Sequence, residues 1–417
     1  MTARAAPWIR LGWLVVVCAA LLALRKPWAL HTPQLWAEDG SIFLTQDEQM
    51  GVRAWWEPYN GYLHLLPRLI AWIASRTADP AWWPAIYNGL AFLLNVAVFA
   101  RIASPRVHLP AKPWLMLAFI AVVGTGEVLI NVTNLQWTTA FLLIVQLFTG
   151  SAGGTPVLPG ASARGSTWRQ QLGDVAILLI VGLNGPFALL FLPLFAWRAW
   201  RDRTADSLLA LSVVTLCAGV ALWLLLRGGG GIHLASTSEP FRPLMFFSLI
   251  GSRLVTWPLF GPAAVFAWPK WIHAALVFVV ILPLIGWALR RDARRQTRAM
   301  IVALFGLVLL AGVYRVRADT WERDDLVNGD RYFFIPRVLL AWLLIWEFDA
   351  RPKAIRWSAR AVAILALAMH VPRFTLPSPP NYHWADHCDP IRRGVPANIK
   401  TLPEGWWIEY PGRTDKR

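Results

Sequence analysis

The sequence predicts an all-α membrane protein, a polytopic helical bundle of about 11 spans within a range of roughly 10 to 13. Of its 417 residues, 56% are hydrophobic and only 15% are charged. That composition is too apolar for a soluble domain of this length. Apolar runs recur along the whole chain, and clusters of Arg and Lys stand between them. No polar stretch is long enough for a sizeable soluble domain.

The chain starts with an apolar helix over residues 8–24, which we interpret as an uncleaved first span with a cytoplasmic N-terminus. A first outer loop follows, from about residue 25 to residue 81. Residues 62–75 are apolar, but Pro67 and Arg68 interrupt them. This predicts a juxtamembrane or re-entrant helix rather than a full span.

The middle of the chain alternates between apolar spans and basic loops. Residues 174–197 contain the break Gly182-Leu-Asn-Gly-Pro186, which predicts two half-spans meeting near the outer face, because Gly and Pro interrupt a helix. Residues 241–268 fit either an interfacial helix or a tight hairpin. The other predicted spans are 82–103, two helices flanking an outer turn at 131–137, 208–226, 272–289, 300–314, 332–346 and 361–371.

The charge distribution orients these spans. With this topology the inner side holds 19 Lys and Arg against 6 Asp and Glu, which is +13 of the net +16. The excess is typical of cytoplasmic loops, so it does not indicate nucleic-acid binding. Residues 1–371 form the predicted transmembrane domain of a multi-pass protein of the bacterial inner membrane. Residues 372–417 form a small periplasmic tail or cap.

The first outer loop carries the candidate catalytic group. Glu38 and Asp39 lie side by side a dozen or so residues beyond the first helix. One carboxylate can act as a general base toward an acceptor hydroxyl. The competing interpretation is a helix cap or a surface acidic pair. Aromatic and polar side chains suited to a sugar or acceptor follow in the same loop: Trp55, Trp56, Tyr59, Asn60, Tyr62 and His64.

This layout resembles the GT-C class of integral-membrane glycosyltransferases, which use polyprenyl-phosphate sugars or related lipid donors. The motifs WAEDG (36–40) and NGYLHLLPR (60–68) are similar to those of bacterial members. The resemblance implies that Asp39 is the base, with Glu38 second. Many members have a Lys-Gly-Pro-like break in a middle span, and this chain has Asn184-Gly185-Pro186 there.

A second group of polar residues is expected to hold the donor. Arg331 stands at the outer start of a span and can grip a lipid phosphate, with Tyr332, Asn184 and Arg68 as further donor contacts. Arg331 has two simpler interpretations: an interfacial anchor, or a partner of Asp330.

No cofactor is expected, and the lipid-linked sugar would be a substrate. The acidic residues Asp319, Glu322, Asp324 and Asp325 fit a divalent-cation site with Asp39, but they fit a solvated loop better. No metal ligand is therefore assigned.

The sequence predicts a glycosyltransferase that moves one sugar from a polyprenyl phosphate to a lipid, glycan or protein on the periplasmic face. It contains no Walker loop or dinucleotide fingerprint, which favours a donor already flipped across the membrane. One rival is a transporter or flippase of lipid-linked saccharides, for which ionisable residues inside spans and an internal repeat are expected. The other is a polymerase or ligase of such saccharides.

Overall fold

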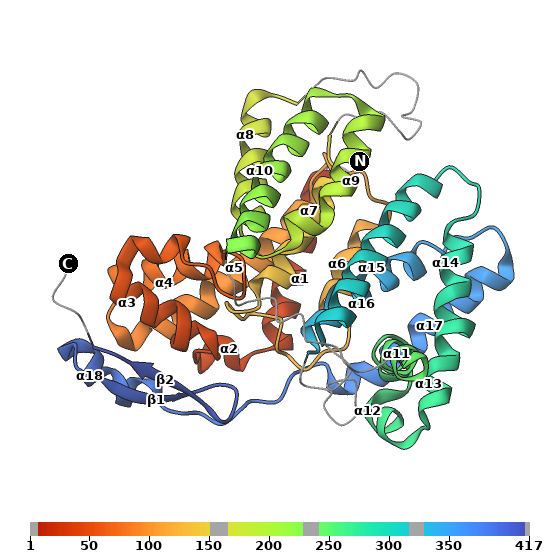
Figure 1. Ribbon diagram of the computed structural model, residues 1–417. Coiled ribbons are helices and arrows are strands. Elements are labelled where there is room, and N and C mark those ends of the chain that lie inside the picture. The colour runs from red at the N-terminus through yellow and green to blue at the C-terminus, as the bar shows by residue number, and fades with distance from the viewer. Residues whose placement is uncertain (1–6, 151–165, 228–241, 317–328, 413–417) are drawn as a thin grey trace, which may run out of the picture.

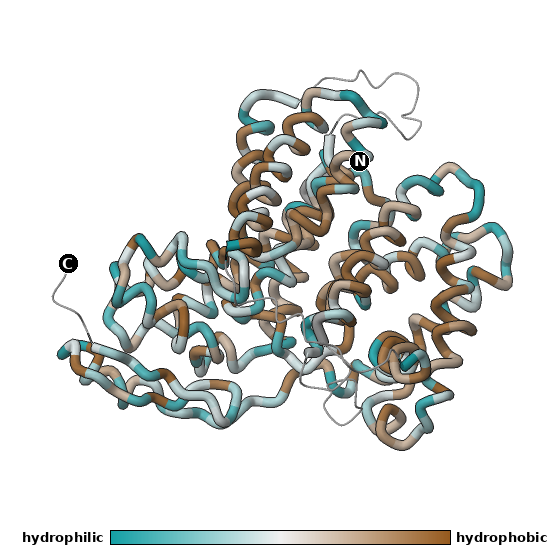
Figure 2. Tube along the Cα trace, viewed as in Figure 1, coloured by the Kyte–Doolittle hydropathy of each residue, from teal (hydrophilic) through white to brown (hydrophobic). Residues whose placement is uncertain are grey.

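The computed structural model describes residues 7–150, 166–227, 242–316 and 329–412. These residues are mostly helical, with one two-stranded sheet near the C-terminus. Figure 1 shows two groups of long helices on one side and the short helices of the first loop with the sheet on the other. Figure 2 shows that the long helices are largely apolar and that the sheet and helix ends are more hydrophilic.

The first loop folds into short helices that lie against the ends of the long ones. Helix α1 (Pro7–Arg25) leads into α2 (Trp28–His31), and the loop then continues to α4 and α5. Pro67 is tolerated in α4 because it lies in the first turn, where its missing N–H has no helical partner. The elements of this part are α1, α2, η1 (Asp39–Leu44, a π-helical turn), α3 (Thr45–Met50), η2 (Gly51–Trp56), α4 (Leu65–Thr77), η3 (Pro80–Trp82) and α5 (Trp83–Ala103).

The next helices are short. Helix α6 (Lys112–Ala121) has 10 residues and α7 (Leu135–Gln146) has 12. At about 1.5 Å per residue neither crosses a hydrocarbon core of about 30 Å. Residues 122–134 join them without regular helix, a longer connection than the outer turn expected at 131–137.

The predicted break in the middle of the chain is confirmed. Helix α8 (Trp168–Gly182) and helix α9 (Phe187–Asp202) flank it, and Gly185 has a φ of 106°, a left-handed value that favours glycine. The break is bonded to the residues just before α4, because Gly185 N–H donates to the Leu63 carbonyl at 2.9 Å. The first loop and the middle of the bundle are thereby joined.

The remaining helices complete the bundle. In the segment 241–268, left open by the sequence, the described residues 242–268 contain helices with a kink at Gly261, whose φ is 82°. The elements are α10 (Ala205–Arg227), α11 (Pro243–Gly251), η4 (Ser252–Thr256), α12 (Trp257–Ala267), α13 (Lys270–Leu276), η5 (Val277–Ile281), α14 (Leu282–Ala288), α15 (Arg295–Val316), α16 (Arg331–Ile345) and α17 (Lys353–His370).

Six of the described helices are long and apolar enough to cross a membrane, which indicates a membrane-embedded protein. They are 80–103, 205–227, 243–267, 270–288, 295–314 and 353–373. The predicted number of about 11 spans is not established by helix length. The difference arises because several predicted spans, such as α6 and α7, are shorter helices.

The C-terminal tail is a folded cap. After η7 (Val371–Arg373) come η8 (Trp384–His387), α18 (Cys388–Arg393) and an antiparallel hairpin of β1 (Ala397–Thr401) and β2 (Trp406–Tyr410). The tail is fixed to the first loop: Trp384 Nε1 donates to the Pro80 carbonyl at 2.8 Å, and Arg392 pairs with Asp79. The hairpin lies beside α2 and α3 in Figure 1.

Candidate active site

A cavity of about 720 Å³ lies between the first loop, the bundle and the C-terminal hairpin. One wall is polar and aromatic and comes mainly from the first loop and residues 127–137. The rest of the lining is formed largely by apolar side chains of α9, α10 and α15. Its lining comprises Trp36, Ala37, Glu38, Phe43, Tyr59, Asn60, Tyr62, His64, Glu127, Thr133, Asn134, Gln136, Trp137, Pro186, Phe187, Leu190, Leu225, Val308, Ala311, Gly312, Tyr314, Arg331, Tyr332, Pro403 and Trp406.

Glu38 is the member of the acidic pair that lines this cavity. Its side chain is half-buried, and Oε1 accepts a hydrogen bond from the Tyr59 hydroxyl at 3.2 Å. Burial raises the pKa of Tyr59 to about 12, so this phenol stays protonated and can donate to Glu38. The carboxylate is therefore oriented by a neighbour and open to a ligand.

Asp39, the residue that the sequence favoured as base, does not line the cavity but is bonded to two residues that do, Trp36 and Thr133. It is fully buried, and its two oxygens accept hydrogen bonds from the Trp36 N–H at 3.1 Å and the Thr133 hydroxyl at 2.6 Å. Burial raises the pKa of Asp39 to about 7, and the Thr133 hydrogen bond opposes this effect. Asp39 thus fixes the turn 36–39, whereas Glu38 lines the cavity.

Arg331 also lines the cavity, and its partner is Glu127. The two side chains form an ion pair, and the Arg331 guanidinium lies 5.2 Å from the Tyr332 ring centroid. Tyr332 packs edge-on against Trp137 at 5.1 Å. The neighbouring Asp330 instead pairs with Arg337 at 2.6 Å, so the simple Arg331–Asp330 pairing is not formed. Arg331 is thus held beside an aromatic pair with its guanidinium at the cavity.

The irregular segment 122–134, which supplies Glu127 and Thr133, is held by buried cations. Arg337 donates to the Val123 carbonyl at 3.0 Å, and Lys26 Nζ donates to the carbonyls of Gly126 at 2.9 Å and Leu129 at 2.7 Å. Non-helical backbone at membrane depth is tolerated where it is buried in protein or lines a cavity, and this segment does both. The cations compensate carbonyls that no helix satisfies.

His64 presents an imidazole to the cavity from the start of α4. It is only 4% exposed, and its ring packs at 5.4 Å from Tyr62 and at 5.6 Å from both Phe43 and Tyr59. Burial lowers its pKa to about 3, so the ring is neutral. Neither ring nitrogen meets a hydrogen-bond partner of ordinary geometry among the described residues, although the Tyr59 backbone lies nearby.

Other buried polar atoms along the lining also lack a hydrogen-bond partner among the described residues. In the described part of the chain, Glu127 Oε2, Gln136 Oε1 and Trp137 Nε1 are buried without a hydrogen-bond partner in the protein. Buried polar groups are normally satisfied, and such a concentration at one cavity is typical of a site for a polar ligand.

Besides Asp39, four predicted site residues lie outside the lining. Trp55 packs edge-on against Trp72 at 5.5 Å, and Trp56 is 64% exposed. Arg68 is buried and donates to Gln46 at 2.8 Å. Asn184 is buried at the α8–α9 break, where its Nδ2 donates to the Thr139 hydroxyl at 3.3 Å. Of these four, Arg68 lies over the Phe43 ring and Asn184 forms a bridge with His64, so these two contact lining residues.

Several lining residues, Glu127 and Trp406 among them, are not predicted from the sequence to belong to the site. Glu127 carried a detectable signal, because it is the only acidic residue between Asp79 and Asp174. Trp406 carried none, because nothing in the sequence shows that the tail returns to the first loop.

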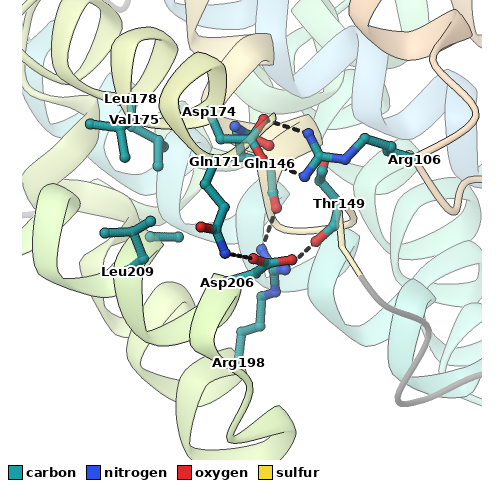
Figure 3. Close-up of a pocket in the computed structure, with 11 residues that line it drawn as sticks. Arg106, Gln146, Thr149, Gln171, Asp174, Val175, Leu178, Arg198, Asp206 and Leu209 are labelled. Atoms are coloured by element: carbon teal, nitrogen blue, oxygen red, sulfur yellow. Dashed lines mark hydrogen bonds and ion pairs between the residues drawn. The ribbon is translucent and has the colours of Figure 1, made fainter. Parts of the chain in front are cut away.

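A second, small cavity of about 20 Å³ lies at the opposite end of the bundle. Figure 3 shows polar side chains of α8, α9 and α10 that point into it and meet partners such as Arg106, Gln146 and Thr149. Asp174 pairs with Arg101 at 2.7 Å and with Arg106 at 2.6 Å, and Gln171 donates to Asp206 at 2.9 Å. These partners fill the space, so it is an ion-pair network rather than a substrate site.

Among the described residues no group of three or more His, Cys, Asp or Glu is placed to hold a metal ion. The acidic residues Asp319, Glu322, Asp324 and Asp325 lie outside the described residues.

Comparison with known proteins gives no match among family models, curated proteins or solved structures.

Proposed function

We propose that this chain is a membrane glycosyltransferase that moves a sugar from a polyprenyl-phosphate donor to an acceptor at the face bearing the first loop. One observation carries the proposal. A single cavity of about 720 Å³ brings together a carboxylate, a guanidinium and an apolar wall of bundle helices. Sugar transfer from a lipid phosphate needs a base, a cation for the leaving phosphate and a surface for the lipid.

In this proposal Glu38 is the general base. The acceptor hydroxyl oxygen attacks the anomeric carbon, and its proton passes to Glu38. The bond between the anomeric carbon and the phosphate oxygen breaks, and polyprenyl phosphate leaves with the electron pair. The buried Asp39 acts as a positioning residue, because it fixes the backbone on which Glu38 is carried.

Arg331 holds the donor phosphate in this proposal. In the structure its charge is balanced by Glu127, so a phosphate oxygen arriving at Arg331 would compete with that carboxylate. Arg is suited to such an exchange because its fork has several donors. The polyprenyl chain would run along Leu190, Leu225, Val308 and Ala311, where the lining is apolar. Tyr59, Asn60, Tyr62 and His64 would face the sugar.

We further propose that the shorter apolar helices also enter the membrane, giving about 11 membrane-inserted segments of a GT-C-like bundle in a bacterial inner membrane. The N-terminus would be cytoplasmic, and the first loop and the C-terminal cap periplasmic. The inside-positive distribution of Arg and Lys supports this orientation.

The decisive experiment compares a strain lacking the gene with strains carrying variants, using mass spectrometry of envelope glycans. We expect one glycan class to lose a single sugar in the deletion strain. Glu38→Gln should fail to restore it, and in a purified transfer assay turnover should fall by about 10²–10⁴. Glu57→Gln is the control, because Glu57 lies in the same loop but does not line the cavity.

Two outcomes would contradict the proposal. Full activity of Glu38→Gln with a large loss in Asp39→Asn at unchanged stability would return the role of base to Asp39. Movement of an intact lipid-linked saccharide across a vesicle membrane, without sugar transfer, would instead establish the transporter or flippase. A polymerase or ligase shares the chemistry and would appear as addition of a chain in place of one sugar.

A further inference from the structure

The C-terminal hairpin contributes two residues to the cavity. Pro403 and Trp406 lie in its lining, although they are more than 300 residues from the first loop in the sequence. They belong to the turn and second strand of the hairpin, where Trp406 pairs with Thr401. The lining is therefore completed by a part of the chain that lies outside the helical bundle.

Main-chain and side-chain contacts fix the hairpin directly to the segment that carries Glu38. Leu402 N–H donates to the Leu35 carbonyl at 3.2 Å, the Leu402 carbonyl accepts from Ala37 N–H, and the Thr401 hydroxyl donates to Leu35 at 2.6 Å. Leu402 also forms a bridge with Trp36. The position of Trp406 relative to Glu38 is thus set by hydrogen bonds between the two segments.

Side-chain packing reinforces this attachment. A Cβ atom added to Gly40 would clash with the buried Ile408 side chain, so glycine allows the hairpin to pack closely on η1. Ile408 is fully buried, and the Tyr410 hydroxyl donates to Glu48 at 3.2 Å. The hairpin is a fixed wall of the site.

The chemistry of this end of the cavity fits a sugar ring. A pyranose has a face of C–H groups that packs on an indole and a rim of hydroxyls that needs hydrogen-bond partners. Trp406 and Trp36 supply aromatic surface, and Glu38 and Asn60 supply polar atoms in the same lining. A lipid chain would use the apolar helical wall instead.

We infer that Trp406 forms an acceptor subsite that packs on a sugar ring, so that the acceptor is a glycan rather than a protein side chain or a simple lipid. This inference rests on the proposed glycosyltransferase function, which it deepens by naming the acceptor class. Trp406 is assigned to the acceptor because its hairpin is bonded to the segment that carries Glu38, the proposed base, whereas the donor phosphate is assigned to Arg331.

The test is a binding measurement that does not depend on turnover. The full chain is labelled with 5-fluorotryptophan and placed in nanodiscs, and the ¹⁹F resonance of Trp406 is assigned by its loss in Trp406→Phe. Methyl glycosides of glucose, galactose, mannose and N-acetylglucosamine are added at millimolar concentration. We expect at least one to shift the Trp406 resonance, because packing on the C–H face tolerates different sugars.

Trp407 is the matched control. It is 48% exposed against 40% for Trp406 and occupies the next position of the same strand, but it lies under Lys400 and does not line the cavity. Saturation-transfer signals of the bound glycoside should weaken about tenfold or more in Trp406→Ala and stay unchanged in Trp407→Ala. Trp406→Phe should retain part of the binding.

The subsite is refuted if no glycoside shifts Trp406 more than Trp407, or if decyl phosphate or a Ser/Thr peptide shifts Trp406 and the glycosides do not. Failure of the proposed function gives a different result. In that case glycosides still bind at Trp406, but the purified chain transfers no sugar. Glu38-dependent transfer without a Trp406 response would refute the subsite alone.

Discussion

Glu38 and Asp39 are adjacent in the sequence, but burial gives their carboxyl groups different chemistry. Asp39 has no contact with the cavity, and burial holds its pKa near 7, whereas Glu38 is open to the cavity beside the Tyr59 hydroxyl. Local turn geometry decides this difference. The backbone turn at 36–39 places the Asp39 carboxylate against Thr133 and leaves Glu38 in the cavity lining.

The first prediction at the scale of single residues concerns the pH dependence of stability. An aspartate titrates at about 3.9 in an unfolded chain, and Asp39 titrates at about 7 when folded. The folded state therefore binds this proton more tightly than the unfolded state does. The stabilisation from the protonated Asp39 is fully present below about pH 4 and is lost as the pH rises through about 7. In Asp39→Asn, the stability of the protein should depend less on pH over this range.

Melting temperatures of the purified protein between about pH 5 and about pH 8 check this expectation. Asp39→Asn should melt at the same or a higher temperature at the alkaline end, with transfer activity within about tenfold of the unmodified chain. A pH profile identical to that of the unmodified chain would show that Asp39 does not titrate in this range. Glu57→Gln serves as the control for loss of a carboxylate from this loop.

The second prediction at this scale concerns Arg331. Arg331→Lys keeps the charge but loses the paired N–H donors of the guanidinium, so its affinity for polyprenyl phosphate should fall by about tenfold. Arg331→Ala should lower this affinity further. Glu127→Gln should raise affinity, because it removes the carboxylate that competes for the guanidinium. Titration of nanodisc-embedded protein with polyprenyl phosphate measures all three. Unchanged affinity in Arg331→Ala, with an unchanged melting temperature, would make Arg331 a simple interfacial residue.

At the scale of elements, short helices and irregular segments build the site. Helices α6 and α7 stop short, and the 13 residues between them fold back to line the cavity. Buried Lys26, Arg25 and Arg337 donate to carbonyls of this segment, which is how irregular backbone is satisfied away from water. The opposite ends of α5, α8 and α9 are held by ion pairs.

The prediction at this scale compares two ion pairs at the end of the bundle opposite the cavity. Asp174 is 17% exposed and holds both Arg101 and Arg106, so Asp174→Asn leaves two largely buried cations without their carboxylate. It should destabilise the protein by about 2–4 kcal/mol. Asp349→Asn is the control, because the Asp349–Arg360 pair spans 3.8 Å and Asp349 is 88% exposed. It should cost less than about 1 kcal/mol.

Thermal unfolding of both variants in the same detergent checks this difference. Equal melting temperatures for Asp174→Asn and Asp349→Asn would show that the network in Figure 3 does not stabilise the helix ends.

In the whole molecule, the segments that connect the helices gather on two faces of the bundle, and contacts join the segments on each face. One face joins residues 25–39, 122–134 and 373–402, through bonds such as Gln34 to Pro380 and Arg25 to Val122. The other joins 101–112 to 174 and 287–298 to 347, through Arg106–Asp174 and Arg298–Glu347. The same grouping follows from the positions of Arg and Lys in the sequence.

The prediction at this scale is the orientation of the two faces. In a background without native cysteines, Gln49→Cys and Ser378→Cys, both at exposed positions, should react with an impermeant maleimide in intact spheroplasts. Ala293→Cys, exposed on the opposite face, should react only after permeabilisation. The reverse pattern would place the cavity in the cytoplasm and contradict the use of a flipped lipid donor.

The sequence by itself determined the helical membrane class, the break at 182–186 and the acidic, aromatic first loop. These depend on hydropathy, on Pro and Gly chemistry and on charge, which act over a few residues. Tertiary structure decided which carboxylate meets the cavity, which acid pairs with Arg331 and which strand closes the site. Glu127 and Trp406 reach the cavity through contacts between residues up to several hundred positions apart, and no local pattern records such contacts. Neither the sequence nor helix length fixes the number of spans, because an apolar run of 10 to 15 residues looks alike whether its helix crosses the membrane or stops inside the bundle.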